Sequence, residues 1–130
     1  MRIHIFLSSL ALLAVSSLTA GAETIKEGTN YCLQCSSGLV IDNQESFSPG
    51  SRLCLSKPDA EKPSQVWRFV SAGNGLYCIM SPLSMMGIDN GGAPKAGASA
   101  IQWDLDKSNR NQLWRIVENT DGSVSFVGAD

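Results

Sequence analysis

Histidine is nearly absent from this chain. The single copy, His4, lies in an apolar N-terminal segment. Once that segment is set aside, a Ser–His or Cys–His nucleophile pair and a histidine-ligated zinc site are excluded. Paired carboxylates of the glycosidase kind stay possible, but the acidic residues fall mostly in turn-like contexts, and nothing marks two of them as facing one bond. We therefore expect no catalytic activity, no cofactor and no metal site in these residues.

Positive charge is also scarce and is spread along the chain. Lys and Arg number 10 against 12 Asp and Glu, which gives a net charge of −2. Binding to nucleic acid or to an anionic membrane surface needs a concentrated basic patch. We expect neither partner.

Only one long apolar run is present, and it lies at the N-terminus. Arg2 gives a basic start, Ile5–Leu18 is apolar apart from serines, and Ala20-Gly21-Ala22 offers small residues at the spacing of a cleavage site. This is the pattern of a secretory signal peptide. We expect residues 1–22 to lie outside the folded domain, and residues 23–130 to be one secreted, extracellular domain.

The cysteines favour disulfide bonds. An even count in a small exported domain is typical of disulfides, and four cysteines allow three connectivities. A redox motif at Cys32-x-x-Cys35 requires a helix after it, but Ser36-Ser37-Gly38 follows. A zinc knuckle requires a second Cys-x-x-Cys pair, which the sequence lacks. The four are Cys32, Cys35, Cys54 and Cys78.

Short strands are predicted along the whole domain. No window has a convincing amphipathic helical period, and apolar or alternating runs are cut by Gly, Pro, Asn and Ser, as in all-β barrels and sandwiches. The expected strands are Tyr31–Gln34, Leu39–Asp42, Arg52–Ser56, Val66–Val70, Leu76–Met80, Met86–Asp89, Ala100–Asp104, Leu113–Val117 and Ser123–Val127.

One arrangement of residues occurs twice, with every member 47 positions apart. Such identical offsets indicate stacked copies of one supersecondary unit, here with four strands in each copy. A third copy begins with the Asp121-Gly122 turn and the strand after it. The repeated residues are Asp42, Gly50, Gln65, Trp67 and Arg68, which recur as Asp89, Gly97, Gln112, Trp114 and Arg115.

Two copies that each end in Gln-x-Trp resemble the ricin-B-type β-trefoil lectins, a module that also serves secreted glycoside hydrolases as a carbohydrate-binding domain. The resemblance covers nearly all of the chain from Thr29 onward. It implies an all-β β-trefoil with two complete four-stranded repeats and the first strand of a third. Because three copies must share one core, we expect Trp67 and Trp114 to be core residues. The carrying motifs are Gly38-Leu39-Val40-Ile41-Asp42 with Ser64-Gln65-Val66-Trp67, and Gly87-Ile88-Asp89 with Ile101-Gln102-Trp103 and Asn111-Gln112-Leu113-Trp114.

The resemblance implies a shallow sugar site in each copy. Its Asp accepts hydrogen bonds from sugar hydroxyls, the Asn before the Gln lies beside it, and the Gln orients the Asp rather than touching sugar. The second copy is the stronger candidate because Ser64 replaces this Asn in the first. The candidate carbohydrate-binding residues are Asp89, Asn111, Gln112, Gln102, Trp103, Asp42 and Gln65.

Trp103 has two interpretations. In plant lectins of this type the stacking aromatic lies two positions after the Gln of the third strand, whereas Trp103 directly follows Gln102. One position changes the face of a strand, which favours a core residue over a sugar platform. Phe47, in the loop after Asp42, is the alternative platform.

Two departures from the family pattern leave questions open. The cysteine-stapled members have a bridge partner two positions before the Asp, where this chain has Val40 and Gly87. A different pairing is therefore expected, for which Cys35–Cys54 and Cys32–Cys78 is one arrangement. The incomplete third copy implies a truncated sequence, a partner chain that completes the barrel, or a degenerate trefoil.

We therefore expect a secreted carbohydrate-binding module without catalytic activity of its own. Two alternatives remain. One is a trefoil that binds a protein or inhibits a protease, its sugar sites having decayed. The other is the N-terminal part of a secreted glycoside hydrolase.

Overall fold

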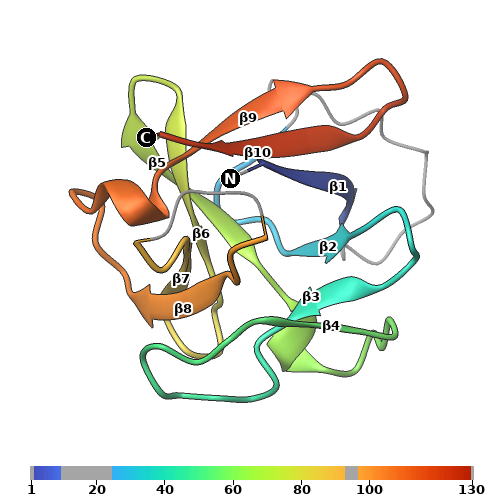
Figure 1. The fold of residues 1–130 in the computed structure, drawn as a ribbon. Coiled ribbons are helices and arrows are strands. Elements are labelled where there is room, and N and C mark those ends of the chain that lie inside the picture. The colour runs from blue at the N-terminus through green and yellow to red at the C-terminus, as the bar shows by residue number, and fades with distance from the viewer. Residues whose placement is uncertain (1, 10–24, 93–96, 130) are drawn as a thin grey trace.

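The computed structural model describes residues 2–9, 25–92 and 97–129, and within these ranges the chain forms strands, turns and short 3-10 helices (Figure 1). None of the helices in these ranges is long and apolar enough to cross a membrane. The elements are β1 (Arg2–Ser9), β2 (Tyr31–Gln34), β3 (Val40–Asp42), β4 (Cys54–Ser56), η2 (Pro63–Gln65), β5 (Arg68–Gly73), β6 (Leu76–Met80), β7 (Met86–Asp89), β8 (Ile101–Asp104), η3 (Arg110–Gln112), β9 (Trp114–Glu118) and β10 (Val124–Gly128).

The strands follow the predicted repeat. β2 to β5 form the first copy, β6 to β9 the second, and β10 begins the third, so the predicted strands are confirmed. β5 and β9 begin later than expected, because η2 and η3 occupy the residues before them. Their C-caps, Val66 and Leu113, donate backbone N–H bonds to Pro63 and Arg110 instead of joining a ladder. The fold is the all-β β-trefoil that the resemblance implied.

The barrel is a ring of antiparallel pairs. β2 pairs with β1, β1 with β10, β10 with β9, β9 with β6, and β6 with β5. A bridge between Tyr31 and Trp67, with N–H···O bonds of 2.8 and 2.9 Å in the two directions, links β2 to the start of β5. The hairpins β3–β4 and β7–β8 lie below this ring in Figure 1.

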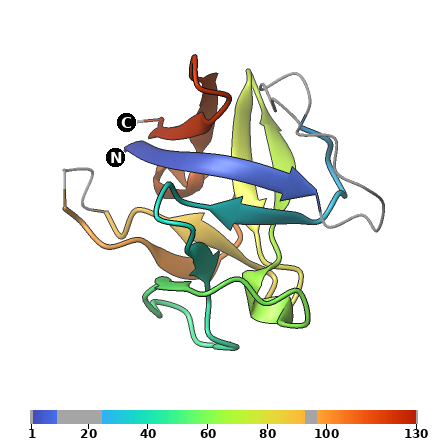
Figure 2. The same cartoon turned by 90° about the vertical axis from the view of Figure 1, so that its right-hand side faces the viewer.

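β1 lies within the segment that the sequence predicted to be outside the folded domain. It pairs on both sides, with Ile3 opposite Phe126 of β10 and Leu7 opposite Leu33 of β2 (Figure 2). In the second repeat, β9 lies in the same way between β6 and β10. β1 therefore takes the place of the fourth strand of the third repeat. Residues 10–24, which hold the rest of the predicted signal peptide and its cleavage site, lie outside the described ranges, so the signal peptide stays a prediction.

The core repeats with the same period as the sequence. Trp67 and Trp114 are both 0% exposed, as predicted, and their indole Nε1 atoms donate to Ile41 O and Ile88 O over 3.0 Å each. Phe69 lies among other aromatics, with its ring centroid 5.3 Å from that of Tyr31. Since a large apolar side chain contributes roughly 1.5–3 kcal/mol on full burial, these residues are the main source of stability.

The four cysteines all lie in described residues, and no disulfide joins any two of them. The predicted disulfides are therefore not seen, and the Cys35–Cys54 and Cys32–Cys78 pairing stays a prediction. Burial raises the pKa of the thiols of Cys35 and Cys78. Since the thiolate is the reactive form, both thiols should react slowly at neutral pH.

Candidate functional site

Asp89 ends β7 and is held by two internal donors. Its Oδ1 accepts the Gly91 N–H over 2.7 Å, and its Oδ2 accepts from Gln112 Nε2 over 3.3 Å. An ionised carboxylate has about four acceptor positions. The turn thus fixes the direction of this side chain and leaves acceptor capacity on both oxygens.

Gln112 is the support of Asp89 that the sequence predicted. Its side chain is 0% exposed. Besides Asp89, its Nε2 donates to Asp104 O over 2.8 Å, and its Oε1 accepts the Asp106 N–H over 3.1 Å. With both ends of the amide engaged and no exposed surface, this residue positions Asp89 and is not available to a ligand.

A hollow of about 210 Å³ opens beside Asp89. It brings together three of the predicted site residues, Asp89, Trp103 and Asn111. The full lining is Asp89, Gly91, Gly92, Ile101, Trp103, Asn109 and Asn111.

Trp103 is 44% exposed, so its interpretation as a core residue is wrong. The reason lies in its neighbour. Gln102 is the residue of β8 that points inward, with 0% exposure, and the alternation of a strand then places Trp103 outside. Its indole lines the hollow together with Asp89.

Asn111 is held at its backbone from two directions. Its N–H donates to the side chain of Asn109, the N-cap of η3, over 3.0 Å. Its carbonyl accepts the Asn90 N–H over 3.0 Å. The backbone is therefore fixed while the side-chain amide remains at the hollow.

The first repeat carries the same supporting framework 47 positions earlier. Gln65 Nε2 donates to Asp42 Oδ2 over 3.2 Å and to Lys57 O over 3.0 Å, and its Oε1 accepts the Asp59 N–H over 2.8 Å. The predicted hydrogen bond from Gln65 to Asp42 is confirmed. The two copies differ in what surrounds the Asp.

Asp42 has two hydrogen-bond donors, the Gln44 N–H and Gln65 Nε2, as Asp89 has two, but Ser56 and Ser64 also lie beside it. Burial works to raise its pKa, but hydrogen bonds outweigh burial and hold the pKa below the usual value. The groups that lower the pKa are the Gln44 N–H and the side chains of Ser64, Gln65 and Ser56. The two serines occupy the places of Asn111 and Trp103, so the residues that face the hollow in the second copy are replaced by hydroxyl groups beside Asp42 in the first.

The turn after the Asp also differs. In the second copy it is Gly91-Gly92, with φ of +70° and +73°. In the first it is Gln44-Glu45, which hold the left-handed conformation with side chains attached, at φ of 55° and 59°. Glycine leaves this wall of the second hollow free of side chains.

Gln102 does not face the hollow, although it was a candidate binding residue. It is fully buried, its Nε2 donates to Ser46 O over 2.9 Å, and its Oε1 accepts from Ser84 Oγ over 3.1 Å. Phe47, the alternative platform, is 62% exposed but does not line the hollow.

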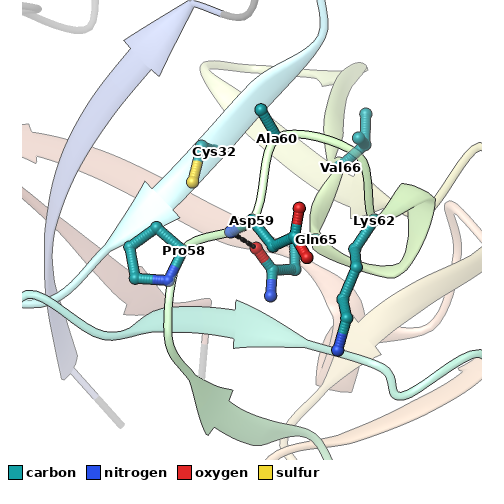
Figure 3. A pocket seen from close by; sticks show the side chains of 7 residues that line it. All are labelled: Cys32, Pro58, Asp59, Ala60, Lys62, Gln65 and Val66. Carbon is teal, nitrogen blue, oxygen red and sulfur yellow. Dashed lines mark hydrogen bonds between the residues drawn. The ribbon is translucent and has the colours of Figure 1, made fainter.

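A second hollow, of about 170 Å³, lies in the first repeat between β2 and the segment before η2 (Figure 3). Cys32 and Pro58 form one side of it, and Gln65 accepts the Asp59 N–H at its wall. Asp42 does not line it. This hollow is therefore not the first-repeat counterpart of the one beside Asp89.

Four lining residues were not predicted from the sequence: Gly91, Gly92, Asn109 and Ile101. Alignment of the two copies carried a signal for the glycines, since Gln44-Glu45 stands at the same offset. Among the described residues, no three His, Cys, Asp or Glu side chains cluster in a way that could hold a metal ion.

Comparisons with known proteins agree with this fold. A family model described as ricin-type beta-trefoil lectin domain-like matches residues 63–130. No curated protein matches the sequence significantly. The designed threefold-symmetric protein ThreeFoil is 29% identical with a TM-score of 0.65, over 71% of this chain and 66% of ThreeFoil.

Two natural proteins are also similar. An exo-β-1,3-galactanase from Clostridium thermocellum is 26% identical with a TM-score of 0.63, over 73% of this chain and 21% of the enzyme. The Polyporus squamosus lectin, solved with a sialylated trisaccharide, shares the fold at 16% identity and a TM-score of 0.56, over 87% of this chain and 48% of the lectin. This chain thus spans less than two thirds of each of these proteins. With the repeat, the trefoil and the matched family model together, the chain belongs to the ricin-type β-trefoil lectin domain-like family.

Proposed function

We propose that this protein binds carbohydrate at the hollow of its second repeat. The observation that carries the proposal is the meeting of Asp89, Asn111 and Trp103 around one open hollow of about 210 Å³. A hydrogen-bonding acceptor, an amide and an exposed aromatic face are what a pyranose ring needs, because such a ring has hydroxyls at its edge and an apolar face of C–H groups.

Each residue has a role that follows from its chemistry. Asp89 accepts from two adjacent hydroxyls, because each of its oxygens has a single internal donor. Hydrogen bonds to a charged acceptor are the stronger kind. The Asn111 amide donates or accepts beside it, and the Trp103 indole stacks on the apolar face of the sugar. Gln112 keeps Asp89 in the direction that this geometry requires.

The first repeat is the weaker site in this proposal. The hydroxyl groups of Ser56 and Ser64 lie beside Asp42 and compete with a ligand for its acceptor positions. The counterpart of Trp103 is Ser56, so no aromatic ring stands at that position. Affinity for one sugar unit should therefore be weak, and a polysaccharide that presents many copies of the unit would be held better through rebinding and multivalency.

The location of this protein and its attachment to a larger enzyme are also proposals. The N-terminal apolar segment favours secretion, and cleavage after Ala22 would remove β1 from the secreted protein. The similarity to 21% of a galactanase favours a second candidate role, as the carbohydrate-binding part of a larger secreted enzyme. That relative also suggests β-1,3-galactan as a first probe, with xylan as the second because both galactose-type and xylan-type members occur in this family.

A polysaccharide pull-down and a glycan array test the proposal. Wild-type protein and Trp103→Ala would be applied to β-1,3-galactan, xylan and a broad glycan panel. We expect retention of the wild type on at least one carbohydrate and a loss of retention for Trp103→Ala. If the wild type were retained on no carbohydrate, the proposed carbohydrate binding would be wrong. If both proteins were retained equally, the proposed site at Trp103 would be wrong.

A further inference from the structure

The loop that follows β3 in the first repeat lies against β8 of the second repeat (Figure 1). Gly50 N donates to Gln102 O over 2.8 Å, and Gln102 N donates to Ser51 O over 2.9 Å. Leu53 N also donates from the loop to the residue before β8, Ala100 O, over 3.0 Å. β8, which carries Trp103, is therefore hydrogen-bonded to the first copy as well as to β7.

The side chain of Gln102 holds this loop from the buried side. Its Nε2 donates to Ser46 O over 2.9 Å and to Ser48 O over 3.4 Å. Its Oε1 accepts from Ser84 Oγ over 3.1 Å, which ties the amide to its own repeat. A fully buried amide with partners from both repeats fixes the loop relative to β8, because losing any partner would leave a buried polar group unpaired.

Gly50 brings the loop against the indole of Trp103. A Cβ on Gly50 would lie 3.4 Å from Trp103 Cζ3 and 3.9 Å from Cε3, which is ordinary van der Waals contact, so a side chain longer than that of alanine would meet the ring. Its φ of +86° also favours glycine. The ring of Trp103 thus lies beside Gly50 of the first repeat while Trp103 lines the hollow of the second.

The positions that match Gln102 and Gly50 in the other repeat differ from them. The counterpart of Gln102 is Leu55, which is 51% exposed. The counterpart of Gly50 is Gly97, which has almost the same φ of +83° but nothing within 4 Å of a Cβ. Among the described residues, the contact between a loop glycine and a tryptophan is therefore made at Gly50 but not at Gly97.

We propose that the hollow of the second repeat is a composite site, in which loop residues 46–51 of the first repeat position the Trp103 platform. Gly50 and Gln102 are positioning residues: Gly50 sets where the indole lies, and Gln102 anchors the loop that carries Gly50. The inference rests on the proposed function for its ligand, but its structural part can be measured without one.

The test compares Gly50→Asn with Gly97→Asn. Asn is the side chain that best tolerates the left-handed conformation, so both variants carry the same backbone strain, and only at Gly50 does the new side chain meet Trp103. Gly50→Ala serves as a milder variant if Gly50→Asn does not fold. Gln102→Leu introduces the residue found at the same place in the first repeat. Thermal unfolding would confirm that each protein is folded.

The first readout is quenching of tryptophan fluorescence by iodide, with no ligand present. Trp67 and Trp114 are 0% exposed and Trp103 is 44% exposed, so iodide reports on Trp103, with Trp103→Phe as the blank. The second readout is affinity for β-1,3-galactan and for xylan by isothermal titration calorimetry. We expect the Gly50 and Gln102 variants to change the quenching and to bind about tenfold more weakly, equivalent to about 1.4 kcal/mol, and Gly97→Asn to change neither.

The outcomes separate this inference from the proposed function. If wild-type protein binds neither polysaccharide, the proposed function fails on these probes, and quenching alone then decides whether Gly50 positions Trp103. If wild type binds and the folded Gly50 variants match it in both readouts, the composite site is wrong. Equal shifts in the Gly50 and Gly97 variants would also overturn it, because backbone strain would then explain the effect.

Discussion

The Nε2 atom of Gln112 donates a hydrogen bond to Oδ2 of Asp89 over 3.3 Å. Both side chains are almost completely buried, with exposures of 0% and 3%. Because Gln112 is fully buried, it makes this bond without contacting a ligand itself. The bond orients Asp89 so that its free acceptor positions point toward the hollow. A sugar would be bound by the aspartate, with the glutamine acting behind it.

Replacing Gln112 by Met should weaken both the fold and sugar binding. The change keeps the volume but leaves Asp104 O, the Asp106 N–H and Asp89 without their partner, which should lower the free energy of unfolding by about 1–3 kcal/mol. Gln65→Met is the matched control, since it removes the same three bonds in the first repeat. Urea unfolding should show similar losses for both. Galactan binding should fall only for Gln112→Met, and an equal fall for both would mean that stability alone is responsible.

The tryptophans should separate into core and surface residues. Trp114→Ala removes a fully buried ring and should cost about 3–5 kcal/mol of unfolding free energy. Trp103→Ala removes a ring that is 44% exposed and should cost clearly less than Trp114→Ala, about 1–2 kcal/mol. Chemical denaturation of both variants measures this. A loss of several kcal/mol for Trp103→Ala would show that the ring belongs to the core after all.

Asp42 should make stability depend on acid pH. Its pKa in the folded protein is lowered from the ordinary value of about 3.9, because its hydrogen bonds outweigh burial. Stabilisation by the carboxylate is then fully present above the ordinary value and is lost as pH falls through the lowered folded pKa. Asp42→Asn should be less stable than wild type at pH 6, and the difference should shrink toward pH 2. A difference that stays constant across this range in urea titrations would contradict the assignment.

β1 should contribute to the stability of the full chain. Ile5 pairs with Val124, and proline there would remove a backbone donor and distort the ladder. Ile5→Pro in residues 1–130 should lower the melting temperature. A protein of residues 23–130 should also be less stable and should associate with rising concentration, because β10 and β2 would then present open strand edges. Equal melting temperatures and a monomeric 23–130 form by light scattering would show that β1 does not close the barrel in solution.

The fold was largely readable from the sequence because the repeat and the hydrophobic pattern agree. The offset of 47 positions that relates Trp67 to Trp114 also relates the bonds their indoles make to Ile41 O and Ile88 O. A single pattern therefore specifies both the strands and the core. The role of β1 was not readable, since an apolar N-terminal run is the same signal for a leader as for a strand that fills an open position in a barrel.

The site was readable only in part. Asp89 and Asn111 follow from the aligned motifs, but the direction of Trp103 depends on which neighbour points inward. Gln102 points inward because it bonds Ser46 and Ser48 of the other repeat. Contacts between residues more than 50 positions apart leave no local pattern. The sequence also did not show that Ser56 and Ser64 lie beside Asp42, because the folded hairpin and η2 bring them there.

The most direct test of the account is the affinity of Asp89→Asn and Asp42→Asn for β-1,3-galactan and xylan, measured by isothermal titration calorimetry beside wild type. Each change replaces one charged acceptor by an amide at the same place in the two repeats. We predict that Asp89→Asn binds at least about tenfold more weakly, in line with the roughly 1.5–3 kcal/mol contributed by a hydrogen bond to a charged group, and that Asp42→Asn binds like wild type. Unchanged binding by Asp89→Asn, or an equal loss in both variants, would contradict a sugar site in the second repeat.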